Sequence, residues 1–510
     1  MVFHKIGNLT AVVDVNAQQC DGRMADVCEI GNLASKLRAF GAVVKEVDGH
    51  NIIEIEQAVQ SHHDSKPTFV LCFTDPCKGF PQLRARAPKL HYVRFNDEAE
   101  KQEWERVLAN MDVEVTESKP ETATETSTQT RKRHLQVGKA VEIPSKKQEL
   151  VQKQPPSKAE VTAIKDVVET CLDPPELVTR PHRSRLLEWA KSHPKAIILT
   201  ADLTSSCEAD LLRDELPQQY MSMGMAEQNM MSFAGGLARE GYHPYIHTFA
   251  VFVTRRPFDQ VAMSIAVPNL PVRLVGFLPG LTTPGGVTHQ AIDDVALMRS
   301  IPNMRVLEVG DATEVESVLD VAESIDGPVY IRMWRGQVPR LFPKSAPMQF
   351  GKVRVLSEGS DVVIVTAGIC TEEALKATKV LQAHGVSIRH LHLSTLVPFP
   401  SEEVVQATKA ATHGLIVMEN HSTIGGLGSA AAEALAEQGI GKKLVRLGVP
   451  MVYAHGASRD YLMEEYGFDS KALIGAVEKL IGKAVVVSQD SEASNQNRVQ
   501  LSAEERPEDL

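Results

Sequence analysis

The sequence predicts an α/β fold built from three doubly wound units, each with a parallel sheet. The first observation is the length, since 510 residues leave room for roughly three domains of about 150 residues each. The second is that short β-branched runs alternate with helical patterns along most of the chain, which is typical of parallel sheets with helices on both faces. Hydrophobic residues make up 43% of the chain and charged residues 23%, so compact cores are expected.

The expected elements fall into three series. In the first unit, strands are predicted at residues 9–14, 42–47 and 68–73, with helices over 30–39 and 52–61. The second series has strands at 196–200, 244–248, 271–275, 305–308 and 329–333, and the third at 362–366, 387–392, 414–418 and 443–446. In such units, binding sites are usually at the carboxyl ends of the strands.

Aromatic residues indicate the boundary between the first unit and the rest. No Phe, Tyr or Trp occurs between Trp104 and Trp189, and the interval is rich in Glu, Lys, Thr, Ser, Gln and Pro. Such a segment buries too little apolar surface to offset the entropy of ordering it. We therefore expect a partial first domain over 1–111, a disordered linker over 112–173, two domains over 174–345 and 346–485, and a disordered tail over 486–510.

Charge and composition exclude several classes of protein. A net charge of -11 argues against a nucleic-acid or anionic-membrane partner, because both attract an excess of Lys and Arg. No run of about 18 apolar residues and no signal peptide is evident, so a cytoplasmic protein is expected. The seven cysteines are scattered without a Cys-x-x-Cys pair, which predicts neither disulfides nor a zinc site.

The most informative stretch covers residues 221–238, where Glu227 stands among small and apolar residues at the start of a predicted helix. Burying an unpaired carboxylate costs several kcal/mol, so Glu227 should cap the helix, reach solvent or have a specific partner. Two further motifs follow it. Residues 247–254 contain Phe249 and Phe252 three positions apart, and a Pro/Gly-rich loop over 280–290 contains His289.

Taken in order, these motifs resemble the pyrimidine-binding domain of transketolases, which are thiamine-diphosphate enzymes. The matching segments are Gly-Met-Ala-Glu-Gln-Asn (224–229), Thr-Phe-Ala-Val-Phe (248–252), Gly-Val-Thr-His-Gln (286–290) and Ile-Pro-Asn-Met (301–304). Residues 420–429 and 458–462 resemble the transketolase C-terminal domain, and residues 8–22 and 46–50 the second half of the diphosphate-binding domain. The sequence of residues 282–289 most resembles that of bacterial transketolase-like proteins made as two subunits.

The resemblance implies catalytic and cofactor-binding roles. Glu227 would hydrogen-bond the aminopyrimidine of thiamine diphosphate, with a pKa raised by burial so that its proton is available. Phe249 and Phe252 would stack on the pyrimidine, although ordinary core aromatics are the alternative. His289 would contact the substrate oxygens at the reacting centre. Asp202 matches a family aspartate near the cofactor, with a helix cap as its alternative.

The resemblance to transketolases also implies which residues bind the metal ion and the substrate. The Asn16 side chain and the main-chain carbonyl of Gln18 would bind Mg²⁺, although a turn residue is the alternative for Asn16. Three residues match positions that hold the sugar phosphate, and for the two arginines surface ion pairing is the alternative. These three are Arg180, Ser206 and Arg335. His91 falls where the family has a histidine lining the substrate channel.

Four features depart from the family pattern. Gly285 replaces an aspartate that hydrogen-bonds a sugar hydroxyl in the family, and Phe277 replaces a histidine that helps to bind the phosphate. The usual sugar phosphates are therefore not assured as substrates. Arg255 stands where the pyrimidine pocket often has a third aromatic residue. The family fixes its metal and diphosphate with a Gly-Asp-Gly segment about thirty residues before the asparagine, and here Asn16 has no such segment before it.

These observations leave three hypotheses. The first is a transketolase-like enzyme or subunit that moves a two-carbon ketol unit between sugars or sugar phosphates. It would act as a homodimer or as a heteromer with a chain supplying the Gly-Asp-Gly segment, unless the start codon is misassigned. The second is a non-catalytic relative that binds or regulates an intact enzyme. The third is another thiamine-diphosphate enzyme, such as a deoxyxylulose-phosphate synthase or the β subunit of a 2-oxo acid dehydrogenase.

Overall fold

The computed structural model has three sheets flanked by helices, which confirms the predicted α/β class. It describes residue 2 and residues 5–61, 63–88, 90–91, 93, 95–110 and 175–485. The expected linker over 112–173 and tail over 486–510 lie outside the described residues. All six cysteines within the described part of the chain are free thiols. No helix there is both long enough and apolar enough to cross a membrane.

The first sheet has three parallel strands in the order β1 (Thr10–Val15), β5 (Thr68–Phe73) and β4 (Val43–Asp48). Helices α2 (Leu33–Ala39) and α3 (Ile52–Gln60) begin where asparagine side chains accept bonds from backbone N–H groups of the first turn. The core of this unit is small, since its buried cluster consists of Ala58, Val70 and Cys72. Large apolar side chains nearby, such as Phe40 and Ile52, remain exposed.

The second sheet has seven strands in the order β17-β11-β12-β10-β9-β7-β8. All neighbours pair in parallel except β17, which is antiparallel to β11. The strands are β7 (Ala196–Thr200), β8 (Tyr220–Ser222), β9 (His243–Phe249), β10 (Arg273–Phe277), β11 (Arg305–Glu308), β12 (Val329–Met333) and β17 (Thr395–Val397). Their helices include α7 (Pro181–Ser192), α8 (Asp210–Glu215), α9 (Glu227–Arg239), α10 (Ala250–Thr254), α12 (Asp294–Arg299) and α13 (Ala312–Glu323). The central strands are buried on both faces, as expected for a sheet covered by helices.

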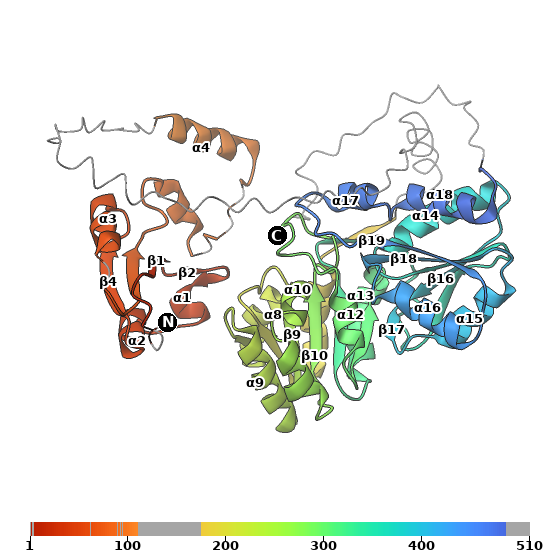
Figure 1. Cartoon of the computed structure of the whole chain (residues 1–510), viewed down its shortest axis with the longest axis horizontal. Coiled ribbons are helices and arrows are strands. Elements are labelled where there is room, and N and C mark those ends of the chain that lie inside the picture. The colour runs from red at the N-terminus through yellow and green to blue at the C-terminus, as the bar shows by residue number, and fades with distance from the viewer. Residues whose placement is uncertain are drawn as a thin grey trace.

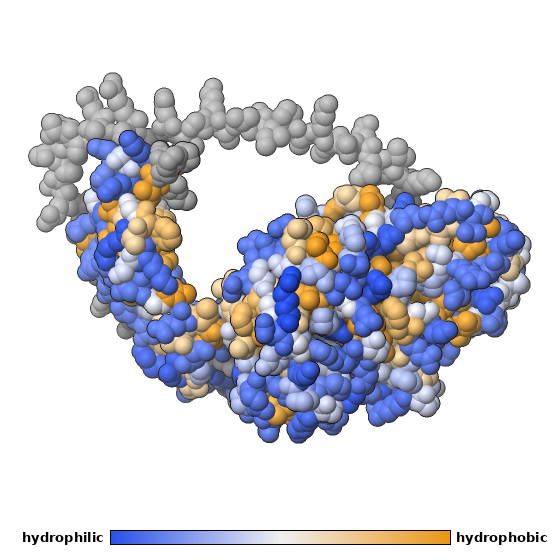
Figure 2. All heavy atoms as spheres, turned by 90° about the horizontal axis from the view of Figure 1, so that it is seen from below, coloured by the Kyte–Doolittle hydropathy of each residue, from blue (hydrophilic) through white to orange (hydrophobic). Residues whose placement is uncertain are grey.

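The third sheet has five strands in the order β14-β16-β15-β18-β19, with β14 antiparallel at one edge. Its strands are β14 (Val353–Ser357), β15 (Val362–Thr366), β16 (Ile388–Leu393), β18 (Gly414–Ser422) and β19 (Lys443–Val449). The helices are α14 (Cys370–Ala383), α15 (Ser401–Ala410), α16 (Leu427–Glu437), α17 (Arg459–Tyr466) and α18 (Ser470–Ile481). Figure 1 shows this unit, in blue, directly beside the green second unit. On the face seen in Figure 2, hydrophobic residues are interspersed among hydrophilic ones.

Two buried polar clusters join the second and third units. Arg332 on β12 is 1% exposed and donates to Asp294 at 2.8 Å, to Glu308 at 2.6 Å and to the carbonyl oxygen of Asn420 on β18 at 2.8 Å. In the second cluster, His392 on β16 lies 3.0 Å from a carboxylate oxygen of Glu314 on α13. Buried charges are tolerated only when they are paired and hydrogen-bonded, so these contacts fix how the two units meet.

The cluster around Arg332 gives a stability prediction. Replacing Arg332 by Met leaves two buried carboxylates without their shared cation, and we expect the free energy of unfolding to fall by about 3–5 kcal/mol. Chemical denaturation followed by circular dichroism measures the change. The matched control is Arg389→Gln, which removes an arginine that pairs with the exposed Glu358 and should cost less than about 1 kcal/mol. Equal losses in the two variants would contradict the prediction.

Candidate functional site

Glu227 is the first residue of α9 and is 5% exposed. The preceding turn passes through Gly224 at φ +64°, a conformation that glycine adopts without strain. One carboxylate oxygen of Glu227 accepts a hydrogen bond from Nη1 of Arg256 at 2.6 Å. The negative charge also lies at the positive end of the helix dipole. Glu227 is therefore buried with a specific cationic partner, one of the arrangements that the sequence left open.

The two phenylalanines and the histidine of the predicted site come together, and Arg256 connects them to Glu227. Phe249 ends β9 and Phe252 lies in α10, with ring centroids 5.7 Å apart. The ring of His289 packs edge-on against both, at 6.0 Å from Phe249 and 5.4 Å from Phe252. Burial lowers the pKa of His289, with the Arg256 charge acting in the same direction and a hydrogen bond to the backbone of Gly285 opposing it. The imidazole is therefore neutral at pH 7.

Arg256 is a residue of the candidate site that no sequence motif indicated. Its guanidinium carbon lies 3.8 Å from the centroid of the Phe252 ring while it bonds Glu227. It therefore covers an aromatic face and a carboxylate at once, an arrangement stabilised by a cation–π interaction. The sequence feature that marks this residue is a pair of arginines, Arg255 and Arg256, directly after an apolar helix. Its neighbour Arg255 turns away and bonds Asp293 at 2.9 Å.

The loop that carries His289 is held by the third unit. The side chain of Asn420 accepts from the N–H of Leu281 at 2.9 Å and donates to the carbonyl oxygen of Pro279 at 3.1 Å. At the other end of the loop, the side-chain amide of Gln290 donates to the carbonyl oxygen of His455 at 3.0 Å. Because these bonds cross between units, the orientation of His289 depends on the packing of both.

Two of the three residues expected to bind a sugar phosphate, Arg335 and Ser206, contact each other beside this centre. Arg335 donates to the carbonyl oxygen of Ser206 at 3.2 Å, and its guanidinium carbon lies 5.7 Å from the Phe249 ring centroid. Arg180 donates to the carbonyl oxygen of Ser205 at 2.7 Å and to Asp210 at 3.3 Å. The structure therefore brings Arg335 close to the aromatic wall, whereas Arg180 is paired with an acid.

Glu208 adds a second acid beside Arg180, at 3.8 Å from its Nε. It is 1% exposed and accepts from the backbone N–H groups of Gly336 at 2.8 Å and Arg183 at 3.2 Å. Burial raises its pKa to about 7, against the opposing effect of these bonds and of Arg180. Arg180 therefore lies beside two acidic side chains of this chain, and one of them, Asp210, is shared with Arg183.

Asp202 connects the second unit to the first. Its carboxylate accepts from the backbone N–H groups of Cys20 at 2.7 Å and Asp21 at 2.9 Å, and Asp21 in turn accepts from the N–H of Thr204 at 2.7 Å. Burial raises the pKa of Asp202 against these bonds and against the nearby His91. The structure thus places Asp202 and His91 at a contact between units. A cofactor or substrate role for either stays a prediction.

The residues expected to bind Mg²⁺ do not form a metal cluster by themselves. The side-chain oxygen of Asn16 accepts from the N–H of Gln18 at 3.0 Å, and its nitrogen donates to Asp14 at 3.0 Å. Among the described residues, no group of three or more His, Cys, Asp or Glu side chains is arranged to hold a metal ion. One amide and one carbonyl are too few ligands for this cation. The donor set present here does not fit a magnesium site without further groups.

Comparison with known proteins gives the family. The family model described as the transketolase pyrimidine binding domain matches residues 182–340, and that described as the transketolase C-terminal domain matches residues 351–473. The chain belongs to the transketolase family. The predicted resemblance to this family, and to its split members, is confirmed.

This transketolase-family chain covers nearly all of some relatives and less than half of others. It is 37% identical over 296 residues to the 6-deoxy-6-sulfo-D-fructose transketolase subunit SqwH of Clostridium sp. (strain MSTE9), covering 58% of this chain and 91% of that subunit. A solved structure described as a split-gene transketolase, inactive beta4 tetramer, has a TM-score of 0.54 and 37% identity, covering 59% of this chain and 97% of its own. A 1-deoxy-D-xylulose-5-phosphate synthase of Prochlorococcus marinus is 31% identical over 300 residues, covering 58% of this chain but only 46% of the synthase.

The site fits one part of thiamine diphosphate and not the other. A buried carboxylate beside two phenyl rings suits the aminopyrimidine, because it offers a hydrogen-bond partner and an apolar stacking wall. The ligands around Asn16 do not fit the metal and diphosphate end. Within the described residues, the candidate site therefore offers groups suited to an aminopyrimidine but too few ligands for a metal-bound diphosphate.

Glu208 gives a prediction about pH. Its pKa rises from the usual 4.5 to about 7 on folding, so its contribution to stability is fully present below pH 4.5 and is lost as the pH rises through 7. We expect Glu208→Gln to remove this dependence, which amounts to about 3 kcal/mol at most. Denaturation curves between pH 4 and 8 measure the effect.

The matched control for this measurement is Asp214→Asn, which changes a mostly exposed carboxylate beside Arg213. It should leave the pH profile of the wild type unchanged between pH 4.5 and 7. If Glu208→Gln showed the wild-type slope over that window, the raised pKa of Glu208 would be refuted.

Proposed function

We propose that this chain is the subunit of a two-chain transketolase that supplies the pyrimidine half of the thiamine-diphosphate site. The observation that carries the proposal is the buried carboxylate of Glu227 within one cluster with Phe252 and His289. Its relation to subunits that it spans over 91% and 97% of their length supports the two-chain form. The proposed domain limits remain 174–345 and 346–485, after a partial domain over 1–111.

In this proposal each residue of the cluster has one task. Glu227 hydrogen-bonds the pyrimidine ring nitrogen, and Phe249 and Phe252 provide the stacking wall. Bound thiamine diphosphate supplies the nucleophilic carbon and the electron sink needed to cleave the bond next to a ketose carbonyl. His289, neutral at pH 7, donates to or accepts a proton from the substrate oxygens. The products are a shortened aldose and a ketose lengthened by two carbons.

The magnesium and the diphosphate would be held with a second polypeptide. Asn16 and the carbonyl of Gln18 could contribute two ligands, and the remaining ligands and charge would come from that partner, which carries the Gly-Asp-Gly segment. Sugars or sugar phosphates are the proposed substrates, and the cytoplasm is the proposed location. No nucleic-acid or membrane partner is proposed.

A non-catalytic regulatory subunit is the second candidate, and one observation favours it. Arg256 occupies both the carboxylate and the ring face that a pyrimidine would use. Calorimetry with thiamine diphosphate and Mg²⁺, on this chain mixed with the amino-terminal partner, separates the two candidates. A catalytic subunit binds the cofactor in the mixture, with Arg256 moving aside. A regulatory subunit adds no binding beyond that of the partner alone.

The catalytic proposal predicts the effect of Glu227→Gln in the two-chain complex. Because the amide cannot transfer a proton to the pyrimidine, kcat for ketol transfer should fall by roughly 10²- to 10⁴-fold. A coupled assay with a panel of ketose donors and aldose acceptors measures kcat and KM.

Glu240→Gln is the matched control, since Glu240 is an exposed residue at the other end of α9. It should keep the wild-type kcat and bind the partner chain equally well. Full activity of the Glu227→Gln complex would rule out the role proposed for Glu227.

A further inference from the structure

The side chain of Arg256 makes two contacts that the proposed function assigns to a bound pyrimidine. Its Nη1 donates to a carboxylate oxygen of Glu227 at 2.6 Å, and its guanidinium carbon lies 3.8 Å from the centroid of the Phe252 ring. A guanidinium group is planar, so it can hydrogen-bond a carboxylate and lie over an aromatic face at the same time. In the free chain, Arg256 therefore takes the place of a planar ligand.

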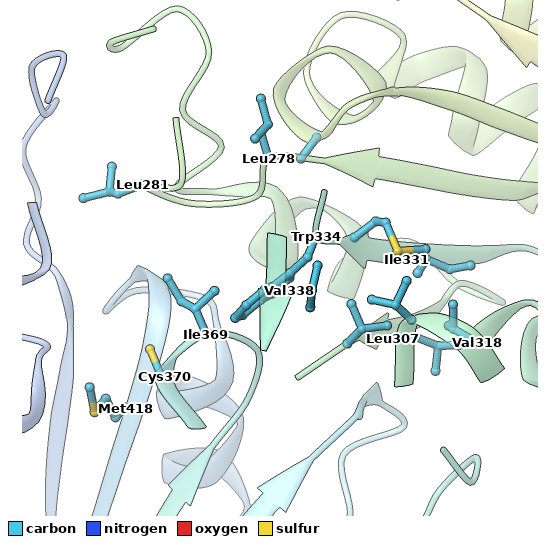
Figure 3. Close-up of a cluster of buried hydrophobic side chains, with 14 of the residues drawn as sticks. Leu278, Leu281, Leu307, Val318, Ile331, Trp334, Val338, Ile369, Cys370 and Met418 are labelled. Carbon is cyan, nitrogen blue, oxygen red and sulfur yellow. The ribbon is translucent and has the colours of Figure 1, made fainter. Parts of the chain in front are cut away.

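The parts of this centre differ in how freely they can move. Glu227 is 5% exposed and Phe249 is 1% exposed, and Phe249 belongs to the buried hydrophobic cluster of which Figure 3 shows a part. Phe252 packs against the same cluster. The side chain of Arg256, by contrast, is 47% exposed and lies in the short connection between α10 and α11 (Phe258–Gln260). Arg256 can therefore leave the centre without disturbing its walls.

The ion pair also bears on the charge of Glu227. A buried carboxylate is stable as an anion when a cation pairs with it, and burial favours the neutral acid when no cation is present. If Arg256 moves into solvent, Glu227 therefore takes up a proton. The protonated acid is the form that donates a hydrogen bond to a ring nitrogen. Departure of the arginine thus frees the ring face and produces the protonated acid together.

We propose that Arg256 is an internal gate of the candidate site, which occupies it in the free chain and moves out when a pyrimidine ring binds. The identity of that ring as part of thiamine diphosphate rests on the proposed function. The gate regulates the site, because a chain that holds Glu227 as a paired anion binds the ring weakly. Only a ligand whose contacts outweigh the ion pair opens it.

Titration of the full chain with thiamine tests the gate without catalysis. Thiamine carries the aminopyrimidine and lacks the diphosphate, so its binding reports on this part of the site alone. In calorimetry, we expect Arg256→Gln to bind thiamine at least tenfold more tightly than the wild type, since no ion pair has to be broken. Arg255→Gln removes the same charge one position earlier, where the side chain bonds Asp293, and should leave the affinity unchanged. Equal, weaker or undetectable binding by Arg256→Gln would overturn the gate.

Proton uptake is a readout that a purely structural ion pair would not change. Arg256 faces two titratable side chains, Glu227 and His289, and its charge adds to burial, the larger cause, in lowering the pKa of His289. In the wild type, thiamine binding expels the arginine, so protons are taken up and the affinity should rise as the pH falls from 8 to 7. Calorimetry in buffers of different ionisation enthalpy counts these protons. Arg256→Gln should take up fewer, and equal uptake in the two proteins would contradict the proposal.

Glu227→Gln provides a second test, which does not depend on the folding of Arg256→Gln. Its amide is uncharged and holds Arg256 less firmly, and it can still donate an N–H to the ring nitrogen. The gate therefore predicts tighter thiamine binding by a variant whose ketol transfer in the two-chain complex is impaired. Thiamine binding no tighter than that of the wild type would exclude the ion pair as the obstacle to the ring.

The gate and the proposed function can fail separately. The thiamine titrations need neither the partner chain nor catalysis, so tighter binding by Arg256→Gln supports the gate even if the two-chain complex transfers no ketol unit. Conversely, ketol transfer by the complex, together with equal thiamine affinities of the wild type and Arg256→Gln, would support the function and exclude the gate.

Discussion

The buried guanidinium of Arg332 is the interaction on which the rest of the structure depends. It stands on a central strand of the second sheet and donates to two carboxylates of its own unit and to a carbonyl oxygen of the third. Removing a cation from water is expensive, so such a group persists only where every partner is in place. The two units therefore meet in a single arrangement, and the residues that follow β10 and β12 are fixed relative to both.

That arrangement explains why a histidine in a glycine-rich loop can be held in place. Loops are normally the least constrained parts of a fold, and residues 280–290 contain Gly280, Gly285 and Gly286. Here Asn420 pins one end of the loop and the carbonyl oxygen of His455 the other. The Cβ of any larger residue at Gly280 would lie 2.3 Å from Asn420, so the close approach itself requires glycine. The third unit thus acts on the candidate centre without contributing a side chain to the aromatic cluster.

The sequence predicted the buried strands and the motifs well, because both are local patterns. Strands such as β7 and β12 were placed at their observed limits, since β-branched runs bounded by turn residues are unambiguous. The contact of Glu227 with Arg256, twenty-nine positions away, depends on how α9 and the segment after α10 pack, and no local pattern shows it. The same holds for Asp202, whose partners at Cys20 and Asp21 are about 180 residues distant. Short edge strands such as β17 were missed, because three residues leave almost no periodicity.

Strand β17 also bears on where such a protein can be divided into two genes. Residues of β17 come after the third unit has begun, yet they pair with Val306 and Leu307 at the edge of the second sheet. A chain cut near residue 345 would leave β11 with an unpaired edge, open to aggregation, until the other piece arrived. Folding of the second unit is therefore completed only after the third is partly synthesised. A break between residues 110 and 175 separates no pair of strands in the described sheets, and it would divide the contacts of Asp202 and Thr204 with Cys20 and Asp21.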